Sequence, residues 1–426
     1  MTLFRPVNIL LILALSVYAY GQQDDFPEGV DESDPALEWS GNFDAKYTFF
    51  HMDKTSPLYA LQFLKQRPAT DVLTQYRLEP YLNAEYRSDE IGFVLKTHAL
   101  YYSEAQSSVD LFEAYGTINP SINTTVQAGK RVYSWGKGYA FNPVGFVNPV
   151  KDPENPELAM AGTLSAHAEY IKSFSSELLQ SMSFTAIVIP SANISGTPFG
   201  EWQGTDIALK TYALLWDTDI DVMVYYSDDN PQKYGFDFAR NIRENVEIHG
   251  EFGAIQNLDR YTIENGVLTG SRVNETVYLM GLRYLDESNT TVIAEYYHNG
   301  AGLSKQEYKS LYGFLTTGAN SGIPLTAQQT FSINQTYFKG NSLMQDYLYI
   351  KAMRPEPFDW LYFTPSVHTI YNLNDNSYLL SFQISYKPII NTDFIFWTTF
   401  FGGSSDSEFG GKQVKERLDL WMRIYF

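Results

Sequence analysis

The side chains that could perform catalysis or bind a metal are scattered along the chain. None of its six histidines lies in a recognisable nucleophile motif. The best cluster is His249 between Glu247 and Glu251, which a strand would place on one face. One imidazole and two carboxylates on a single strand are too few ligands for a specific metal site. We therefore expect no catalytic residues, no cofactor and no bound metal.

A larger set of charged side chains occupies alternate positions in otherwise apolar runs. Successive side chains of a β-strand point to opposite faces, so such runs have one apolar and one charged face. Rings of like charge would set an ion preference, whereas paired charges would only brace the wall. The sequence leaves both options open. We predict that the following residues line the interior of a barrel: Arg77, Glu79, Glu85, Lys96, Arg131, Lys210, Arg283, Glu295, Lys351 and Arg423.

The elements that would position these charges are long alternating strands. In the run from Gln75 to Arg87, Tyr76 and Tyr86 stand at the two ends of the apolar face. At ~3.3 Å per residue and a tilt of roughly 40°, the distance between them corresponds to a height of about 25 Å. That is the height of the lipid-facing band of a membrane barrel. Strands in soluble sandwiches are usually shorter, at about five or six residues.

Strand-like runs recur from residue 38 to residue 426 without a change in composition. We count about 18 of them, which predicts a closed, antiparallel, up-and-down transmembrane β-barrel. Short turns tend to alternate with long loops, as expected if one rim carries turns and the other carries loops. A secreted sandwich would expose too much apolar surface, and a β-helix would show a repeat. The long loops are expected at His51 to Leu73, Ser134 to Ala161, Gln256 to Asn274 and Asn299 to Met344.

The beginning of the chain has the features of an export signal. Residues 1–21 combine Arg5, a short apolar run and small residues, as in a secretory signal peptide. Residues 22–37 are acidic and poor in apolar side chains, which predicts a disordered periplasmic leader. Residues 38–426 would then form one barrel domain. The net charge of -19 argues against nucleic acid as a partner, and the absence of cysteine leaves no disulfides.

The last strand, Val414 to Phe426, alternates without interruption from Leu418 onward. It resembles the closing strand of Gram-negative outer-membrane β-barrels. The resemblance implies a location in the outer membrane, in contact with its lipid and lipopolysaccharide. It also implies that Phe426 forms part of the signal read by the barrel-insertion machinery.

The segment from Arg131 to Ala161 carries four prolines and three glycines, which favour a loop over a strand. It resembles a segment of an uncharacterised family of porin-like barrels, which implies the same fold and location but leaves the solute unknown. The residues that carry this resemblance are Gly129, Lys130, Arg131, Trp135, Gly136 and the Asn-Pro pairs at 142–143 and 148–149.

Two loops are long enough to affect a pore. If residues 134–161 fold into the lumen they narrow it, and if they stay outside they only cover the rim. The side chains expected at such a constriction are Trp135, Lys137, Tyr139 and Phe141. The loop at residues 299–344 contains a predicted helix from Ser304 to Thr316, which would be a lid or an incidental loop helix.

Together these patterns favour an outer-membrane porin for passive diffusion of a small polar or organic solute. The alternative is a structural or export barrel, which would export a polymer or serve as a scaffold for a periplasmic partner.

Overall fold

Eighteen antiparallel strands form one closed sheet in the computed structural model of the chain. The structure describes residues 37–64, 70–103, 107–193, 201–340 and 342–426. The predicted signal peptide and residues 22–36 of the predicted leader lie outside the described residues. The first strand begins at Leu37, one residue before the predicted start of the barrel.

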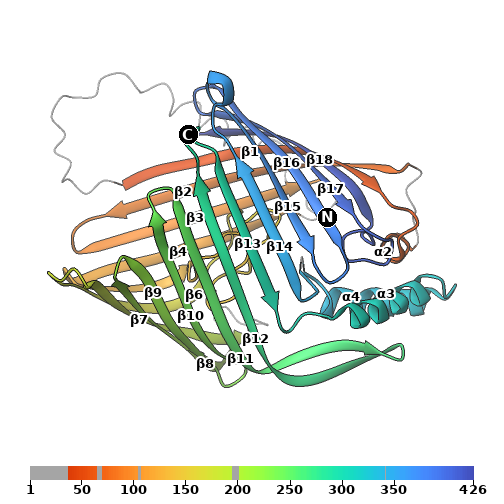
Figure 1. Cartoon of the computed structure of the whole chain (residues 1–426), viewed down its shortest axis with the longest axis horizontal. Helices are drawn as coiled ribbons and strands as arrows, with labels where there is room; N and C mark the ends of the chain where they lie inside the picture. The colour runs from red at the N-terminus through yellow and green to blue at the C-terminus, as the bar shows by residue number, and fades with distance from the viewer. Residues whose placement is uncertain (1–36, 65–69, 104–106, 194–200, 341) are drawn as a thin grey trace.

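The strands run in chain order around the barrel (Figure 1). Their bounds are β1 Leu37–Met52, β2 Val72–Arg87, β3 Ile91–Tyr102, β4 Ser108–Ser121, β5 Thr124–Arg131, β6 Thr163–Ser173, β7 Leu179–Asn193, β8 Glu201–Leu215, β9 Thr218–Tyr226, β10 Gln232–Arg243, β11 Val246–Glu264, β12 Val267–Leu285, β13 Thr291–Asn299, β14 Asp346–Met353, β15 Phe363–Asn372, β16 Ser377–Ile389, β17 Thr392–Gly402 and β18 Val414–Tyr425.

The barrel closes where β1 pairs with both β2 and β18. Tyr47 of β1 lies opposite Tyr76 on one side and opposite Leu420 on the other. Because the ring is closed, neither the first nor the last strand leaves an unpaired edge. The predicted antiparallel barrel of about 18 strands is confirmed.

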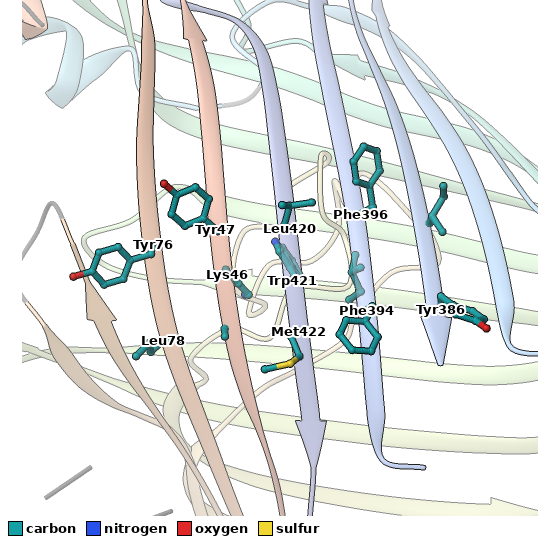
Figure 2. A pocket seen from close by; sticks show the side chains of 13 residues that line it. Lys46, Tyr47, Tyr76, Leu78, Tyr386, Phe394, Phe396, Leu420, Trp421 and Met422 are labelled. Atoms are coloured by element: carbon teal, nitrogen blue, oxygen red, sulfur yellow. The ribbon is translucent and has the colours of Figure 1, made fainter. Parts of the chain in front are cut away.

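The two faces of the wall differ as the alternation predicts. In β18 the side chains of Leu420 and Ile424 are 42% and 39% exposed, whereas Asp419, the residue before Leu420, is only 4% exposed. The outer faces of neighbouring strands form a continuous apolar belt. Figure 2 shows part of it, a shallow hollow of about 510 Å³. Its outward-facing lining residues include Tyr47, Tyr76, Leu78, Phe394, Phe396, Leu420 and Met422. An apolar surface of this extent is energetically favourable in contact with the hydrocarbon chains of a membrane and unfavourable in contact with water.

The prediction of a long loop at 256–274 is wrong. β11 and β12 continue through this region after an irregularity between Ile255 and Leu258, and their hairpin extends beyond the barrel wall (Figure 1). The hairpin turns at Asn265 and Gly266, which have φ values of 51° and 79°. Two positive φ angles match a two-residue hairpin turn, for which Asn-Gly is a favoured sequence. The Asn-Gly pair was the signal that the prediction of a loop overlooked.

Three helices lie at the same end of the barrel as this hairpin (Figure 1). They are α2 (Pro57–Gln62), α3 (Lys305–Ala319) and α4 (Pro324–Tyr337). The predicted helix at residues 304–316 corresponds to α3, and Ser304 and Glu307 form its capping box. The other two helices were not predicted. In the part of the chain that the structure describes, no helix is both long and apolar enough to span a membrane.

The helices pack on one another and on the barrel through a single apolar core. From α3, the buried side chains of Tyr308, Leu311 and Leu315 belong to this core, together with Leu61 of α2. Phe409, from the loop between β17 and β18, is 1% exposed and completes it. We call α2, α3, α4 and residues 403–413 the mouth cover.

Candidate functional site: a loop held inside the barrel

Residues 132–162, which connect β5 to β6, run inside the barrel (Figure 1). We call this segment the inner loop. It contacts inward-facing side chains of β9, β10, β11 and β13, on the wall away from its own two strands. It therefore occupies part of the barrel interior.

Two buried wall carboxylates bind the backbone of the inner loop. Glu251 of β11, 3% exposed, accepts hydrogen bonds from the N–H groups of Lys137 (2.6 Å), Gly138 (2.5 Å) and Val144 (3.1 Å). A carboxylate that accepts several backbone N–H bonds makes strong, charge-assisted contacts. Glu251 therefore fixes the position of the first half of the loop.

Glu295 of β13 plays the same part next to it. It is fully buried and accepts hydrogen bonds from the N–H groups of Tyr139 (2.5 Å) and Ala140 (2.9 Å). The Nε2 atom of His249 lies 3.0 Å from its Oε1 atom. The loop backbone from Lys137 to Ala140 is thus bound without interruption by two wall side chains.

The glycines of this segment are required by the tight folding of the loop on itself and by its close approach to Glu251. Gly136 has a φ of +90°, and a Cβ atom there would lie 2.0 Å from Oδ1 of Asn142. A Cβ atom on Gly138 would lie 2.1 Å from the carbonyl oxygen of Phe141 and 3.1 Å from Oε1 of Glu251. Larger residues would displace the loop from the wall. This explains the two glycines on either side of Lys137.

The side chain of Lys137 adds an ionic contact. Its Nζ atom lies 2.9 Å from Asp221 of β9 and 3.9 Å from Asp237 of β10. Burial alone would lower the pKa of Lys137, but Asp221 and Asp237 together raise it above its usual value. Asp221, Asp237 and Glu251 lie directly opposite one another on three adjacent strands. The Lys137 side chain contacts this acidic row on the wall through Asp221 and Asp237.

Trp135 and Phe141 are not pore-facing, although both were predicted at the constriction. Trp135 is 4% exposed and packs with Ile187, Met223 and neighbouring residues of β7 to β9. Phe141 is also 4% exposed and stacks on Tyr297 of β13, with ring centroids 4.5 Å apart. These aromatic side chains anchor the loop in two separate apolar cores.

The second half of the inner loop is held by ion pairs. Glu154 lies 3.2 Å from Arg417 of β18 and 3.5 Å from Lys412. Burial would raise the pKa of Glu154, but these two cations bring it below its usual value. Glu157 accepts a hydrogen bond from Tyr139 Oη (2.6 Å) and lies 3.3 Å from Lys351 of β14.

Several other predicted pore residues belong to networks within the wall. Glu79 is 3.0 Å from Lys46, and Arg423 makes two bonds of 2.7 Å to Asp44. Most of these charges are therefore paired, which agrees with the alternative in which paired charges brace the barrel wall. The remaining contacts are Arg77 to Glu79 (3.7 Å), Glu85 to Arg87, Lys96 to Glu113 (2.6 Å), Arg131 to His167 (2.8 Å) and Lys210 to Asp221 (3.4 Å).

The side chains of Glu247, His249 and Glu251 do not share one binding partner. Glu251 binds the inner loop, while His249 lies between Glu295 and Glu247. Among the residues that the structure describes, no group of three or more His, Cys, Asp or Glu side chains could hold a metal ion. Sequence reasoning placed Glu251 on one strand face with Glu247 and His249 but did not find its role, because its partners are backbone groups more than 100 residues away.

A cavity of about 410 Å³ lies between the inner loop and the wall. Loop residues Lys137, Tyr139, Lys151 and Glu157 form one side. The wall contributes residues of β11 to β14 on the other side. They are Glu247, His249, Arg283, Thr291, Ile293, Lys351 and Met353. Of the predicted pore-lining residues, only Arg283 and Lys351 lie here, and Lys137 and Tyr139 join them from the loop.

No family model and no curated protein sequence matches the chain. Solved structures of outer-membrane proteins are similar to it in fold. OccAB1 of Acinetobacter baumannii is 11% identical, with a TM-score of 0.54 and coverage of 93% of this chain and 99% of that one. OccK2 (OpdF) of Pseudomonas aeruginosa, solved in complex with glucuronate, is 8% identical, with a TM-score of 0.53 and coverage of 92% and 98%. OccD3 (OpdP) of the same species is 10% identical, with a TM-score of 0.51 and coverage of 94% and 92%. At these identities the likeness is one of fold.

Proposed function

We propose that the protein is a Gram-negative outer-membrane channel for passive diffusion of a small polar or organic solute. The observation that carries the proposal is the polar cavity that lies inside the barrel between the inner loop and the wall. A barrel of this strand number has room for water, so its lumen charges need not be dehydrated. The fold shared with other outer-membrane barrels is consistent with this function.

The inner loop would determine the narrowest part of the path. Lys137, Tyr139, Lys151 and Glu157 are the loop side chains that a solute would meet beside the wall. The outer apolar belt would contact lipid and lipopolysaccharide, and Phe426 would serve as part of the signal for the barrel-insertion machinery. The structural or export alternative has no specific observation in its favour among the described residues.

Planar-bilayer recording tests the channel. The purified protein should give stepwise, ohmic conductance, and replacement of residues 134–161 by a short Gly-Ser linker should enlarge each step. Arg272→Ala is the control. This side chain is 75% exposed on the part of the β11–β12 hairpin that extends beyond the barrel wall, which we call the outer hairpin. Its loss should leave the conductance step unchanged. A protein that inserts as a folded barrel yet never conducts, even with the linker, would contradict the proposal.

A further inference from the structure

The cavity beside the inner loop has an excess of cationic side chains. Four cations line it, Lys137, Lys151, Arg283 and Lys351, against the two carboxylates of Glu157 and Glu247. Two of the cations are already neutralised by neighbours. Lys137 lies 2.9 Å from Asp221, and Lys351 lies 3.3 Å from Glu157.

Among the described residues, no carboxylate forms an ion pair with Arg283 or Lys151. Arg283 projects from β12 with its side chain exposed, and within the described residues it has neither an ion pair nor a hydrogen bond. In the part of the chain that the structure describes, Lys151 donates to the backbone carbonyls of Gly138 (2.6 Å) and Tyr139 (3.2 Å) and to no other group. Glu247 lies opposite Arg283 in the register of β11 and β12 but makes no ion pair with it.

The acids behind the cavity do not satisfy these cations. Glu251 and Glu295 together accept five backbone N–H groups, so their oxygens are occupied by the loop. Burial lowers the pKa of Lys151, with Glu251 and Glu295 acting in the opposite direction. An anion in the cavity would add a further negative charge that favours the ammonium form.

The rest of the lining indicates what kind of anion fits. Ile293, Met353, Pro156 and the ring of Tyr139 are apolar surfaces in the same cavity. Pockets of roughly 300–1,000 Å³ hold small organic ligands, and this one measures about 410 Å³. The planar guanidinium of Arg283 suits a carboxylate, which it can bind with two parallel hydrogen bonds.

We infer that this cavity is a binding site for a small organic anion, with Arg283 and Lys151 as its specificity-determining residues. The carboxylate would contact Arg283 and Lys151, and the hydrocarbon part would pack on Ile293 and Met353. The inference rests on the proposed channel function and names the class of solute that the channel favours. A solute held here would lie between the loop and the wall, on the path past the constriction.

Benzoate and benzamide test this inference, because they share a shape and differ in charge. Calorimetric titration of the detergent-solubilised protein should show that benzoate binds more tightly than benzamide. The double variant R283Q/K151Q should weaken benzoate binding roughly tenfold or more, since it removes two charge-assisted contacts. The control is R272Q, which removes the same charge from the outer hairpin and should bind benzoate as the wild type does. Equal binding of the two ligands, or unchanged binding by the double variant, overturns the inference.

Bilayer recording in a KCl gradient separates this inference from the channel proposal. R283Q should shift the reversal potential toward cation selectivity, and R272Q should not. A protein that binds benzoate through Arg283 but does not conduct contradicts the channel while supporting the site. A protein that conducts with a reversal potential unaffected by R283Q contradicts the anion site alone.

Discussion

The inner loop and the mouth cover are both additions to the same barrel, but they are held in different ways. Polar groups fix much of the inner loop, through Glu251, Glu295 and the ion pairs of its second half. The mouth cover is held mainly by an apolar core around Leu311 and Phe409, which Phe141 of the inner loop also joins. A loop inside a wet lumen can use buried carboxylates for position because its backbone N–H groups supply the partners. A cover at the end of the barrel can exclude water and pack like a small domain.

The largest expected effect is release of the inner loop by removing both wall carboxylates. The double variant Glu251→Ala and Glu295→Ala deprives five backbone N–H groups of a charged acceptor. Hydrogen bonds to charged groups contribute about 1.5–3 kcal/mol each, so the loss of five of them weakens the attachment of the loop to the wall. We expect larger and noisier single-channel conductance, measured in planar bilayers.

Glu79→Ala is the matched control for this prediction. Glu79 is also a buried inner-face carboxylate, but its partners, Lys46 and Tyr81, belong to the wall. Its removal should leave the conductance step close to that of the wild type. An equal increase in both variants would mean that loss of any buried carboxylate loosens the barrel, and that the inner loop has no special anchor.

The stability of the mouth cover should depend on apolar packing rather than on wall carboxylates. Leu311→Ala removes a side chain that is 1% exposed in the shared core, at a cost of about 2–5 kcal/mol. We expect faster proteolysis within α3 and α4, while the conductance step keeps its size because the inner loop still sets the narrowest point. Leu325→Ala on α4, where the side chain is 63% exposed, is the control and should change neither readout. An enlarged conductance step in Leu311→Ala would place the narrowest point in the cover.

The same contrast explains which parts could be predicted from the sequence. Strand alternation predicts the closed barrel and places Glu79, Glu295 and Arg423 on the inner face, because a period of two residues is a local property. The capping box predicts α3 for the same reason. The partners of Glu251 and Glu295 could not be predicted, since they are backbone groups that carry no sequence signature. The aromatic character of Trp135 and Phe141 was visible, but whether they line the pore or anchor the loop depends on distant strands.

A buried carboxyl group within the mouth cover is an exception to its apolar packing. Glu408 is 4% exposed and joins several loops at this end of the barrel. It accepts hydrogen bonds from Tyr347 Oη (2.6 Å), Asn372 Nδ2 (2.6 Å) and the N–H of Leu343 (2.7 Å). Its own N–H donates to Asp375 at 2.7 Å. The cover therefore depends on the ionisation of one buried carboxyl group.

Burial raises the pKa of Glu408 from its usual 4.5 to about 7, and the nearby Asp375 acts in the same direction. Tyr347, the N–H of Leu343 and Lys412 oppose this shift without cancelling it. A carboxyl group whose pKa is raised in the packed state favours packing when it is protonated. The cover should therefore lose stability as the pH rises from about 4.5 to about 7, by about 3 kcal/mol in total.

Proteolysis of residues 403–413, followed at a series of pH values, should accelerate over this range and level off above it. Glu408→Gln is neutral at every pH and should remove the dependence while keeping the cover in place. A pH profile that is the same in this variant and in the wild type would assign the dependence to another group.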